Sequence, residues 1–287
     1  MNDKNLHSNH LEEKNTAFFS GGKIHWEKTD AEVWAELLEK IQNQPSRKKI
    51  QLFPKMVKYA AAAAIILAVT LGAVTFSYQK TVVSLPGEHL TARLPDKSVV
   101  QLNADSKIKY YPLKWRLERK VFLEGEAYFE VETGKKFSVV SKKGITEVLG
   151  TSFNIYARNE KYRVACLTGR VQVTSNKQNQ VVLEPGSKAA LENGRFVVQK
   201  NHNVENIISW KNNRFFFAGT PLKEVIDEIE RQYGVTIQIE EKLDNRNFAG
   251  NFPKKYNVEE VLDFVCTAMQ IKFVKQSENV FLVVENS

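Results

Sequence analysis

The run YAAAAAIILAVTLGAVTFSYQ, residues 59–79, decides how the whole chain is organised. It contains no charged residue and is bounded by Lys58 and Lys80. A helix rises about 1.5 Å per residue, so a helix of this length crosses the roughly 30 Å hydrocarbon core of a bilayer. A signal peptide would lie nearer the N-terminus, and a buried soluble helix would show a broader polar stripe than the few hydroxyl groups here provide. The run therefore predicts a single transmembrane helix.

The charges on either side of this helix predict its orientation. A cluster of basic residues with no acid between them precedes it: Arg47, Lys48, Lys49, Lys55 and Lys58. The first charges after it are Lys80 and Glu88. The positive-inside rule therefore keeps residues 1–58 in the cytoplasm and exports residues 81–287. We expect a single-pass protein of the inner (cytoplasmic) membrane, whose basic cluster also suits the anionic lipids of the inner leaflet.

The overall charge and the two cysteines narrow the function classes. The formal net charge is +8, but part of it lies in the juxtamembrane cluster and the rest is interleaved with acids. This distribution does not predict direct nucleic-acid binding. Cys166 and Cys266 each lie within an apolar pattern, in what read as separate domains. We expect buried free thiols rather than a disulfide.

One amphipathic helix is predicted in the cytoplasmic segment, residues 1–58. Thr29 and Asp30 are suited to cap the sequence AEVWAELLEKIQ, and Trp26 just upstream could fold back onto its apolar face. That face consists of Val33, Trp34, Leu37, Leu38 and Ile41. So short a segment cannot bury this face internally. It is expected either to self-associate, to pack along the membrane, or to dock into a groove of a cytoplasmic partner.

In residues 81–197 apolar and polar residues alternate with a period of two, which predicts an all-β domain. Short alternating runs such as SVVQLN, RKVFLEG and YRVACL are separated by turn residues such as Pro86-Gly87 and Asn193-Gly194. This spacing fits a sandwich, a barrel or a stacked-hairpin solenoid. Four acids close in sequence are expected to form a solvated face or a contact for a basic partner rather than a catalytic pair: Glu124, Glu126, Glu130 and Glu132.

Residues 210–287 predict a small α+β domain with the order β-α-β-β-α-β-β. Thr220 is expected to cap the first helix with Pro221 at its first position, and Gly234 to close it. Asn257 is expected to cap the second helix, with Glu260 at the capping-box position.

The exported region resembles the FecR family of transmembrane regulators, named for ferric-citrate uptake. The likeness lies in the succession LPDKSVVQLNADSKIKY, RKVFLEGEAYFEV, FSVVSKKGITEVLGTSFNIYA, LTGRVQV and LEPGSKAAL. Lys97 departs from the pattern, because the family usually has glycine after Pro-Asp. Trp210 and the phrase TPLKEVIDEIERQYGVTIQI are similar to the C-terminal domain of FecR-like proteins in Bacteroidota. That domain is itself similar to the short signalling domains of secretins and TonB-dependent receptors.

This resemblance implies an anti-sigma factor. The exported domains would read the signalling domain of a TonB-dependent outer-membrane receptor, and the cytoplasmic helix would hold an extracytoplasmic-function (ECF) sigma factor. Trp26 and the five apolar residues of the helix would then form the sigma-binding site. Strand addition at a sheet edge could join the receptor to either exported domain, and the second is favoured. The alternatives are a periplasmic structural tether or envelope-assembly protein without sigma-factor binding, and an exported enzyme.

The sequence contains few residues or motifs that are typical of catalysis or metal binding. It has no HExxH or CxxC spacing for a metal and no GxSxG nucleophile motif, so neither cofactor, metal nor enzymatic activity is expected. One covalent reaction is conceivable at Gly150-Thr151 in VLGTSFN. The threonine hydroxyl could attack the preceding carbonyl, and the resulting ester would hydrolyse. The plainer interpretation is that Gly150 forms a bulge or turn and that Thr151 begins a strand.

Overall fold

The computed structural model describes residues 27–43, 54–200, 203–254 and 257–286. The first helix among these residues, α2 (Asp30–Gln42), begins where the sequence predicts. The Glu32 carboxylate accepts hydrogen bonds from the N–H of Thr29 at 2.7 Å and from its hydroxyl at 2.9 Å. These contacts hold the residue that precedes the first turn of the helix.

The apolar run forms the helix α3 (Pro54–Ser77). Within it, Met56–Ser77 is long and apolar enough to cross a membrane, and its apolar side chains are not buried against the rest of the protein. No other helix in the described part of the chain meets this criterion. The helix ends two residues before the end of the apolar run, and a strand begins at Lys80.

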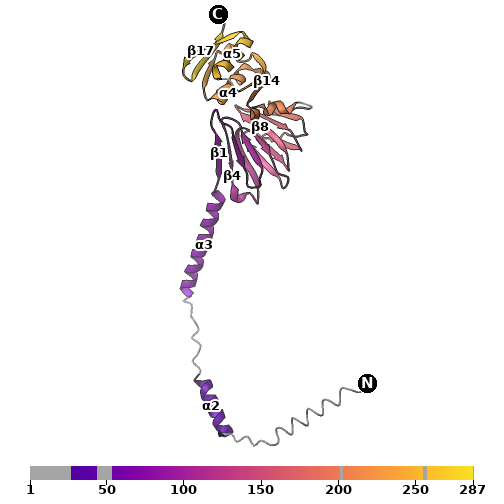
Figure 1. The fold of residues 1–287 in the computed structure, drawn as a ribbon. Coiled ribbons are helices and arrows are strands. Elements are labelled where there is room, and N and C mark those ends of the chain that lie inside the picture. The colour runs from indigo at the N-terminus through magenta and orange to yellow at the C-terminus, as the bar shows by residue number, and fades with distance from the viewer. Residues whose placement is uncertain (1–26, 44–53, 201–202, 255–256, 287) are drawn as a thin grey trace, which may run out of the picture. The chain divides into compact units, whose positions relative to one another are not determined.

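Thirteen strands and one short 3₁₀ helix, η1 (Pro112–Lys114), follow α3 (Figure 1). The strands are β1 (Lys80–Ser84), β2 (Leu90–Arg93), β3 (Val99–Leu102), β4 (Ser106–Tyr110), β5 (Arg119–Glu130), β6 (Phe137–Ser141), β7 (Gly144–Val148), β8 (Ser152–Arg158), β9 (Lys161–Cys166), β10 (Val171–Ser175), β11 (Gln180–Leu183), β12 (Ser187–Glu192) and β13 (Arg195–Gln199).

These strands form two sheets that share β5. One sheet has the order β1-β4-β5-β6-β7-β10-β11 and the other β2-β3-β5-β8-β9-β12-β13. The first half of β5 pairs with β4 and β6, and its second half, from Gly125 onward, pairs with β8 and β3. Gly125 has φ 104°, and a Cβ there would lie 2.7 Å from the Cα of Ser106. Only glycine therefore fits where β5 passes from one sheet to the other.

The inner faces of the two sheets share one hydrophobic core. Phe129 of β5 lies at its centre, stacked on Phe153 with 5.0 Å between ring centroids and edge-on to Phe137 at 6.3 Å. Of the three expected all-β architectures, the domain is therefore closest to a sandwich, in which the two sheets are joined through their shared strand β5. This confirms the prediction of a mainly β domain. We call it the β-sandwich domain.

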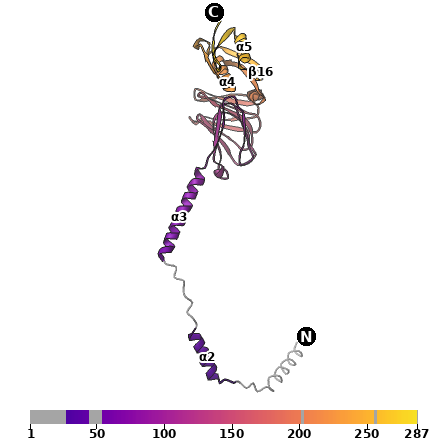
Figure 2. The same ribbon diagram turned by 60° about the vertical axis from the view of Figure 1, so that its left-hand side comes forward.

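The C-terminal domain follows after a 3₁₀ segment, η2 (Val204–Asn212). Its elements are β14 (Arg214–Pro221), α4 (Leu222–Tyr233), β15 (Thr236–Ile239), η3 (Glu241–Leu243), β16 (Asn247–Pro253), α5 (Val258–Met269), β17 (Ile271–Ser277) and β18 (Val280–Glu285). β14 pairs with β16, and a second sheet has the order β15-β18-β17. Figure 2 labels α4, α5 and β16 of this domain. The predicted β-α-β-β-α-β-β order and α+β class are confirmed. A second core fills the space between these sheets and both helices.

The helix ends in this domain agree with the sequence in two places and differ in one. Gly234 closes α4 in the left-handed conformation, and the Asn257 side chain accepts the N–H of Glu260 at 2.8 Å. The predicted cap at Thr220 is wrong. Thr220 pairs with Phe248 and Pro221 pairs with Asn247, so β14 continues to Pro221 and the helix begins at Leu222. The ladder to β16 holds Thr220 as a strand residue.

Lys97 takes the backbone conformation for which the family uses glycine, with φ 73°. The turn is closed by hydrogen bonds between Leu94 and Lys97 and between Leu94 and Ser98. Asp96 accepts the N–H of Ser98 at 3.1 Å and the Nε of the buried Arg119 at 2.7 Å. These contacts offset the cost of a left-handed side chain.

Both cysteines are buried free thiols, as predicted. Burial raises the pKa of Cys166 to about 11 and that of Cys266 to about 12. At neutral pH both are protonated and therefore poor nucleophiles.

Candidate functional site

The predicted binding face of α2 is exposed along its whole length. Trp34 is 66% exposed and Leu38 is 55% exposed, and Val33, Leu37 and Ile41 are exposed as well. They lie at helical spacings of three and four, so they form one stripe. Trp26 lies outside the described residues.

The opposite side of α2 is polar and internally paired. The Glu36 carboxylate accepts hydrogen bonds from the ammonium groups of Lys28 at 2.7 Å and Lys40 at 3.2 Å. These hydrogen bonds lower the pKa of Glu36. Exposed pairs of this kind contribute little to stability. The helix therefore combines a solvated charged side with an uncovered apolar stripe that contains one tryptophan, a composition typical of a helix that docks into a groove.

Gly150 and Thr151 lie at a bend just before β8. Thr151 is buried, and its backbone exchanges hydrogen bonds with Val131 at 3.2 and 3.0 Å. Its hydroxyl donates to the carbonyl of Arg170 at 3.2 Å. A Cβ on Gly150 would lie 2.7 Å from the Cα of Thr133, so close backbone approach is one reason for glycine here.

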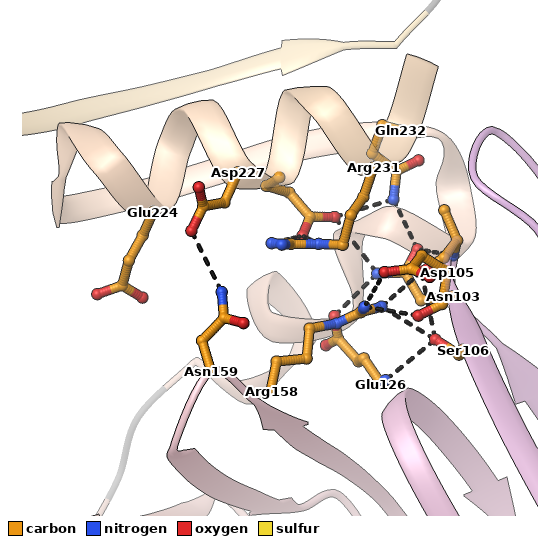
Figure 3. Close-up of polar contacts among 12 residues, drawn as sticks. Asn103, Asp105, Ser106, Glu126, Arg158, Asn159, Glu224, Asp227, Arg231 and Gln232 are labelled. Carbon is orange, nitrogen blue, oxygen red and sulfur yellow. Dashed lines mark hydrogen bonds and ion pairs between the residues drawn. The ribbon is translucent and has the colours of Figure 1, made fainter. Parts of the chain in front are cut away.

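A second site was not foreseen from the sequence: a buried polar junction between the β-sandwich domain and the C-terminal domain (Figure 3). At its centre, Gln232 of α4 donates through Nε2 to Asn103 Oδ1 at 2.6 Å and to Glu228 Oε1 at 2.9 Å. Asn103 in turn donates to Glu126 at 2.8 Å. Asn103 and Gln232 are both buried. Buried amides whose partners come from different domains specify one relative arrangement of those domains.

Glu126 is the ionisable group at the centre of this junction, and the expectation that it lies on a solvated face is wrong. Its carboxylate accepts from Asn103 and from Asn154, each at 2.8 Å. Val121, Leu123, Ala127 and Phe129 of β5 face the core of the sandwich, so Glu126 lies on the outer face of the strand. It is buried because Glu228 and Gln232 of α4 lie over this face beside Asn103. Burial raises the pKa of Glu126, and the charge of Glu228 raises it further, whereas Arg158 opposes the shift. Glu124, Glu130 and Glu132 are exposed, as predicted.

Arg158 ties the loop after β3 to the same centre. It donates to the carbonyls of Ala104 and Asp105 and to the Ser106 hydroxyl, the last at 2.9 Å. Ser106 also accepts the N–H of Glu126 at 3.1 Å. Arg158 therefore holds the loop that carries Asn103 in position.

His89 and the turn after β1 complete the junction. His89 Nε2 lies 3.1 Å from Gln232 Oε1, so it carries the proton, and its ring is edge-on to Trp210 at 5.4 Å. Burial lowers the pKa of His89, with a further contribution from the charge of Lys254. Gly87 donates to the Arg231 carbonyl at 2.7 Å. Nothing in the spacing of these residues indicates that they meet, because they come together only through the packing of the two domains.

Ion pairs surround the polar centre. Glu224 of α4 pairs with both Lys161 and Arg163 of β9. Burial opposes its ionisation, but the hydrogen bond from Lys161 and the charge of Arg163 outweigh burial, so the pKa of Glu224 is lowered. Lys211 of η2 lies 3.4 Å from the centre of the Tyr128 ring.

A cavity of about 560 Å³ lies beside this junction, between β9, β12, η2 and β14. Aromatic and charged side chains line it, among them Tyr156, Trp210, Arg163 and Glu224. Within the described residues, no group of three or more His, Cys, Asp or Glu side chains could hold a metal.

Two comparisons bear on the identity of the chain. The FecR protein family matches residues 80–172, and the FecR C-terminal family matches residues 214–283. No curated protein matches the sequence. Two crystal structures, each described as a "putative anti-sigma factor" from Parabacteroides distasonis ATCC 8503, are similar over their whole length. One is 28% identical, covers 73% of this chain and has a TM-score of 0.68; the other is 27% identical, covers 72% and has a TM-score of 0.67. The β-sandwich domain and the C-terminal domain thus match the two domains of one family in the same order, and the chain belongs to the FecR family.

Proposed function

We propose that this chain is a single-pass inner-membrane regulator of a sigma factor, with α2 in the cytoplasm and residues 81–287 in the periplasm. Four observations support the proposal: the family, the similarity to anti-sigma factor structures, the one helix among the described residues that is apolar enough to span a membrane, and the basic residues that precede it. The observation that carries it is the uncovered apolar stripe of α2.

The stripe of α2 is the proposed binding site for an ECF sigma factor. A tryptophan and leucines that become buried in a partner groove commonly dominate binding, each at about 2 kcal/mol or more. Trp34→Ala or Leu38→Asp is therefore expected to weaken sigma-factor binding about 30-fold. Because both side chains are exposed, neither change should affect membrane insertion.

The test is a reporter of sigma-dependent transcription together with capture of the sigma factor by residues 1–58. Glu39→Ala, on the polar side of the same helix, is the matched control. We expect the reporter to turn on in the Trp34 and Leu38 variants and to stay unchanged in the control. Unchanged output in both stripe variants would remove α2 as the site.

The C-terminal domain is the proposed contact for the signalling domain of a TonB-dependent outer-membrane receptor. β17 is an edge strand of its three-stranded sheet, and most of its residues are exposed, including Val274 at 48%. An edge strand can accept a further strand from a partner. Removal of residues 210–287 uncovers a junction whose centre is polar, so the β-sandwich domain should stay folded.

We expect that truncation to insert normally but not to respond to inducer, and Val274→Asp to weaken the response without unfolding the domain. A normal response from the truncation would move the contact to the β-sandwich domain. A structural tether without sigma-factor binding is the alternative function. It predicts that residues 1–58 capture no sigma factor and that loss of the chain alters the envelope rather than transcription.

A further inference from the structure

The loop between β4 and β5, residues 111–118, exposes two leucines beside two cations. Leu117 is 77% exposed, the highest value among the exposed large apolar side chains of the described residues, and Leu113 is 57% exposed. Lys114 and Arg116 lie between them in the sequence. Apolar groups grouped in this way on a folded domain mark a contact surface.

Packing holds the loop in this shape. Trp115 is buried, with its ring edge-on to Tyr110 at 5.6 Å and to Phe137 at 5.9 Å. The N–H groups of Leu117 and Glu118 both donate to the Lys114 carbonyl at 2.9 Å. Trp115 is thus an anchor in the core, and the leucines on either side of it are held outward.

Chain connectivity places this loop close to the end of α3. Only Tyr78 and Gln79 separate the helix from β1, and the three steps from Ser77 to Lys80 span at most about 11 Å. Lys80 pairs with Tyr110, the residue directly before the loop. The headgroup region extends roughly 5–8 Å beyond the hydrocarbon core. A sandwich attached by so short a connection keeps this end near the headgroups when α3 spans the bilayer.

One contact fixes the level of the loop more closely. Lys114 Nζ lies 4.6 Å from the centre of the Phe76 ring and 4.7 Å from that of Tyr111. Phe76 is the next-to-last residue of the candidate span, so this ammonium lies where hydrocarbon gives way to headgroups. The acid of the loop, Glu118, is paired with Lys120, which leaves the loop basic.

We propose that residues 111–118 form a membrane-surface contact, in which Leu113 and Leu117 enter the headgroup region and Lys114 and Arg116 bind anionic phospholipid headgroups. Apolar side chains flanked by cations are the usual composition of interfacial anchors. The contact rests on the proposed membrane span of α3. It would hold one end of the sandwich on the bilayer. The C-terminal domain contacts the other end of β1, where Gly87 donates to Arg231, and would therefore face away from the membrane.

The test uses the full chain in nanodiscs of phosphatidylcholine and phosphatidylglycerol with a spin-labelled quencher near the headgroups. Leu117→Cys carries an environment-sensitive fluorophore, and Val274→Cys in the C-terminal domain carries the same fluorophore as the matched control. The native cysteines are buried and should not react. We expect at least twofold stronger quenching at position 117 than at 274. Lys114→Glu with Arg116→Glu should reduce the quenching at 117 by half or more.

A further label at Leu67, in the middle of α3, distinguishes failure of the loop contact from failure of the span. Quenching of Leu67→Cys by a deep quencher shows that the helix is inserted. With that control positive, equal quenching at positions 117 and 274 would overturn the proposal and leave the loop as a surface for a protein partner. Quenching at 117 that is unchanged by the two charge reversals or by omission of phosphatidylglycerol would overturn the role of anionic headgroups.

Discussion

Gln232 donates a 2.6 Å hydrogen bond to Asn103, and this single contact joins residues 129 positions apart in the sequence. Gln232 lies near the end of α4, and Asn103 directly follows β3. Both of the remaining amide groups are used as well, because Gln232 accepts from His89 and Asn103 donates to Glu126. The C-terminal domain is thus held on the β-sandwich domain by side chains with little freedom to exchange partners. A movement of one domain relative to the other therefore requires these hydrogen bonds to break.

Gln232→Ala should loosen this junction. The change leaves the proton of His89 without its acceptor, at a cost of about 1–3 kcal/mol for a buried polar group. Asn103 Oδ1 loses the hydrogen bond from Gln232 and keeps the one from the N–H of Ala104. We expect faster hydrogen exchange in α4 and in the turn after β1, with the cores of both domains still protected. Gln238→Ala, at an exposed position of β15, is the control and should change neither region. Equal exchange in both variants would show that the hydrogen bond does not hold the domains together.

Glu126 predicts a pH dependence of stability. Its pKa is raised in the folded chain, so the folded state binds the proton more tightly than the unfolded state does. The tighter proton binding adds to the free energy of unfolding. This stabilisation is fully present below the usual glutamate pKa of about 4.5 and is lost as the pH rises through the raised pKa. Within that window each pH unit removes at most about 1.4 kcal/mol. The free energy of unfolding, measured by denaturant titration from pH 4 upward, should fall less steeply in Glu126→Gln. Parallel pH profiles for the two proteins would contradict this prediction.

Lys97→Gly should stabilise the β-sandwich domain. A left-handed conformation destabilises a non-glycine residue by about 1–2 kcal/mol, which glycine avoids. The greater freedom of glycine in the unfolded chain offsets about 0.5–1 kcal/mol of this gain. The net gain is about 0.5–1 kcal/mol, or an increase in Tm of about 2 °C. Lys97→Ala removes the same side chain but keeps the Cβ, so it should bring no such gain. A decrease in Tm for the glycine variant would mean that the Lys97 side chain itself stabilises the turn.

Cys166 and Cys266 should resist thiol reagents in the native chain. Both are buried, with pKa values raised to about 11 and about 12. Mass spectrometry after incubation with a maleimide at pH 7 should show no adduct on folded protein and two adducts after unfolding in denaturant. Rapid modification of Cys166 alone would indicate that the loop beside it, whose carbonyls at Thr168 and Gly169 accept from its thiol, opens in solution.

Self-cleavage between Gly150 and Thr151 would yield residues 1–150 and 151–287. The backbone pairing of Thr151 with Val131 would keep the pieces together under native conditions, so a denaturing gel is required. Thr151→Ala should abolish the two bands, whereas Ser152→Ala should leave them. A single intact mass after prolonged incubation of the wild-type chain would support the plainer interpretation, in which Gly150 forms only a bend.

Local sequence determined the elements of this protein. The uncharged run before Lys80 is enough to specify a helix that can span a membrane, because length and apolarity alone decide this. The stripe of α2, the period of two in the sandwich and the caps at Gly234 and Asn257 are likewise set by residues a few positions apart. Each of these depends on backbone geometry within one element, which a sequence displays directly.

Tertiary structure alone decided which residues lie between the domains. Glu126 reads as one of four solvated acids until the C-terminal domain covers the outer face of β5, where its carboxylate accepts from Asn103 and Asn154. Thr220 reads as a helix cap until β16 pairs with it. In both cases a partner that is distant in sequence supplies the hydrogen bonds. The local pattern contains no information about such a partner, because the free energy of the contact arises only when the two segments are brought together and water is excluded.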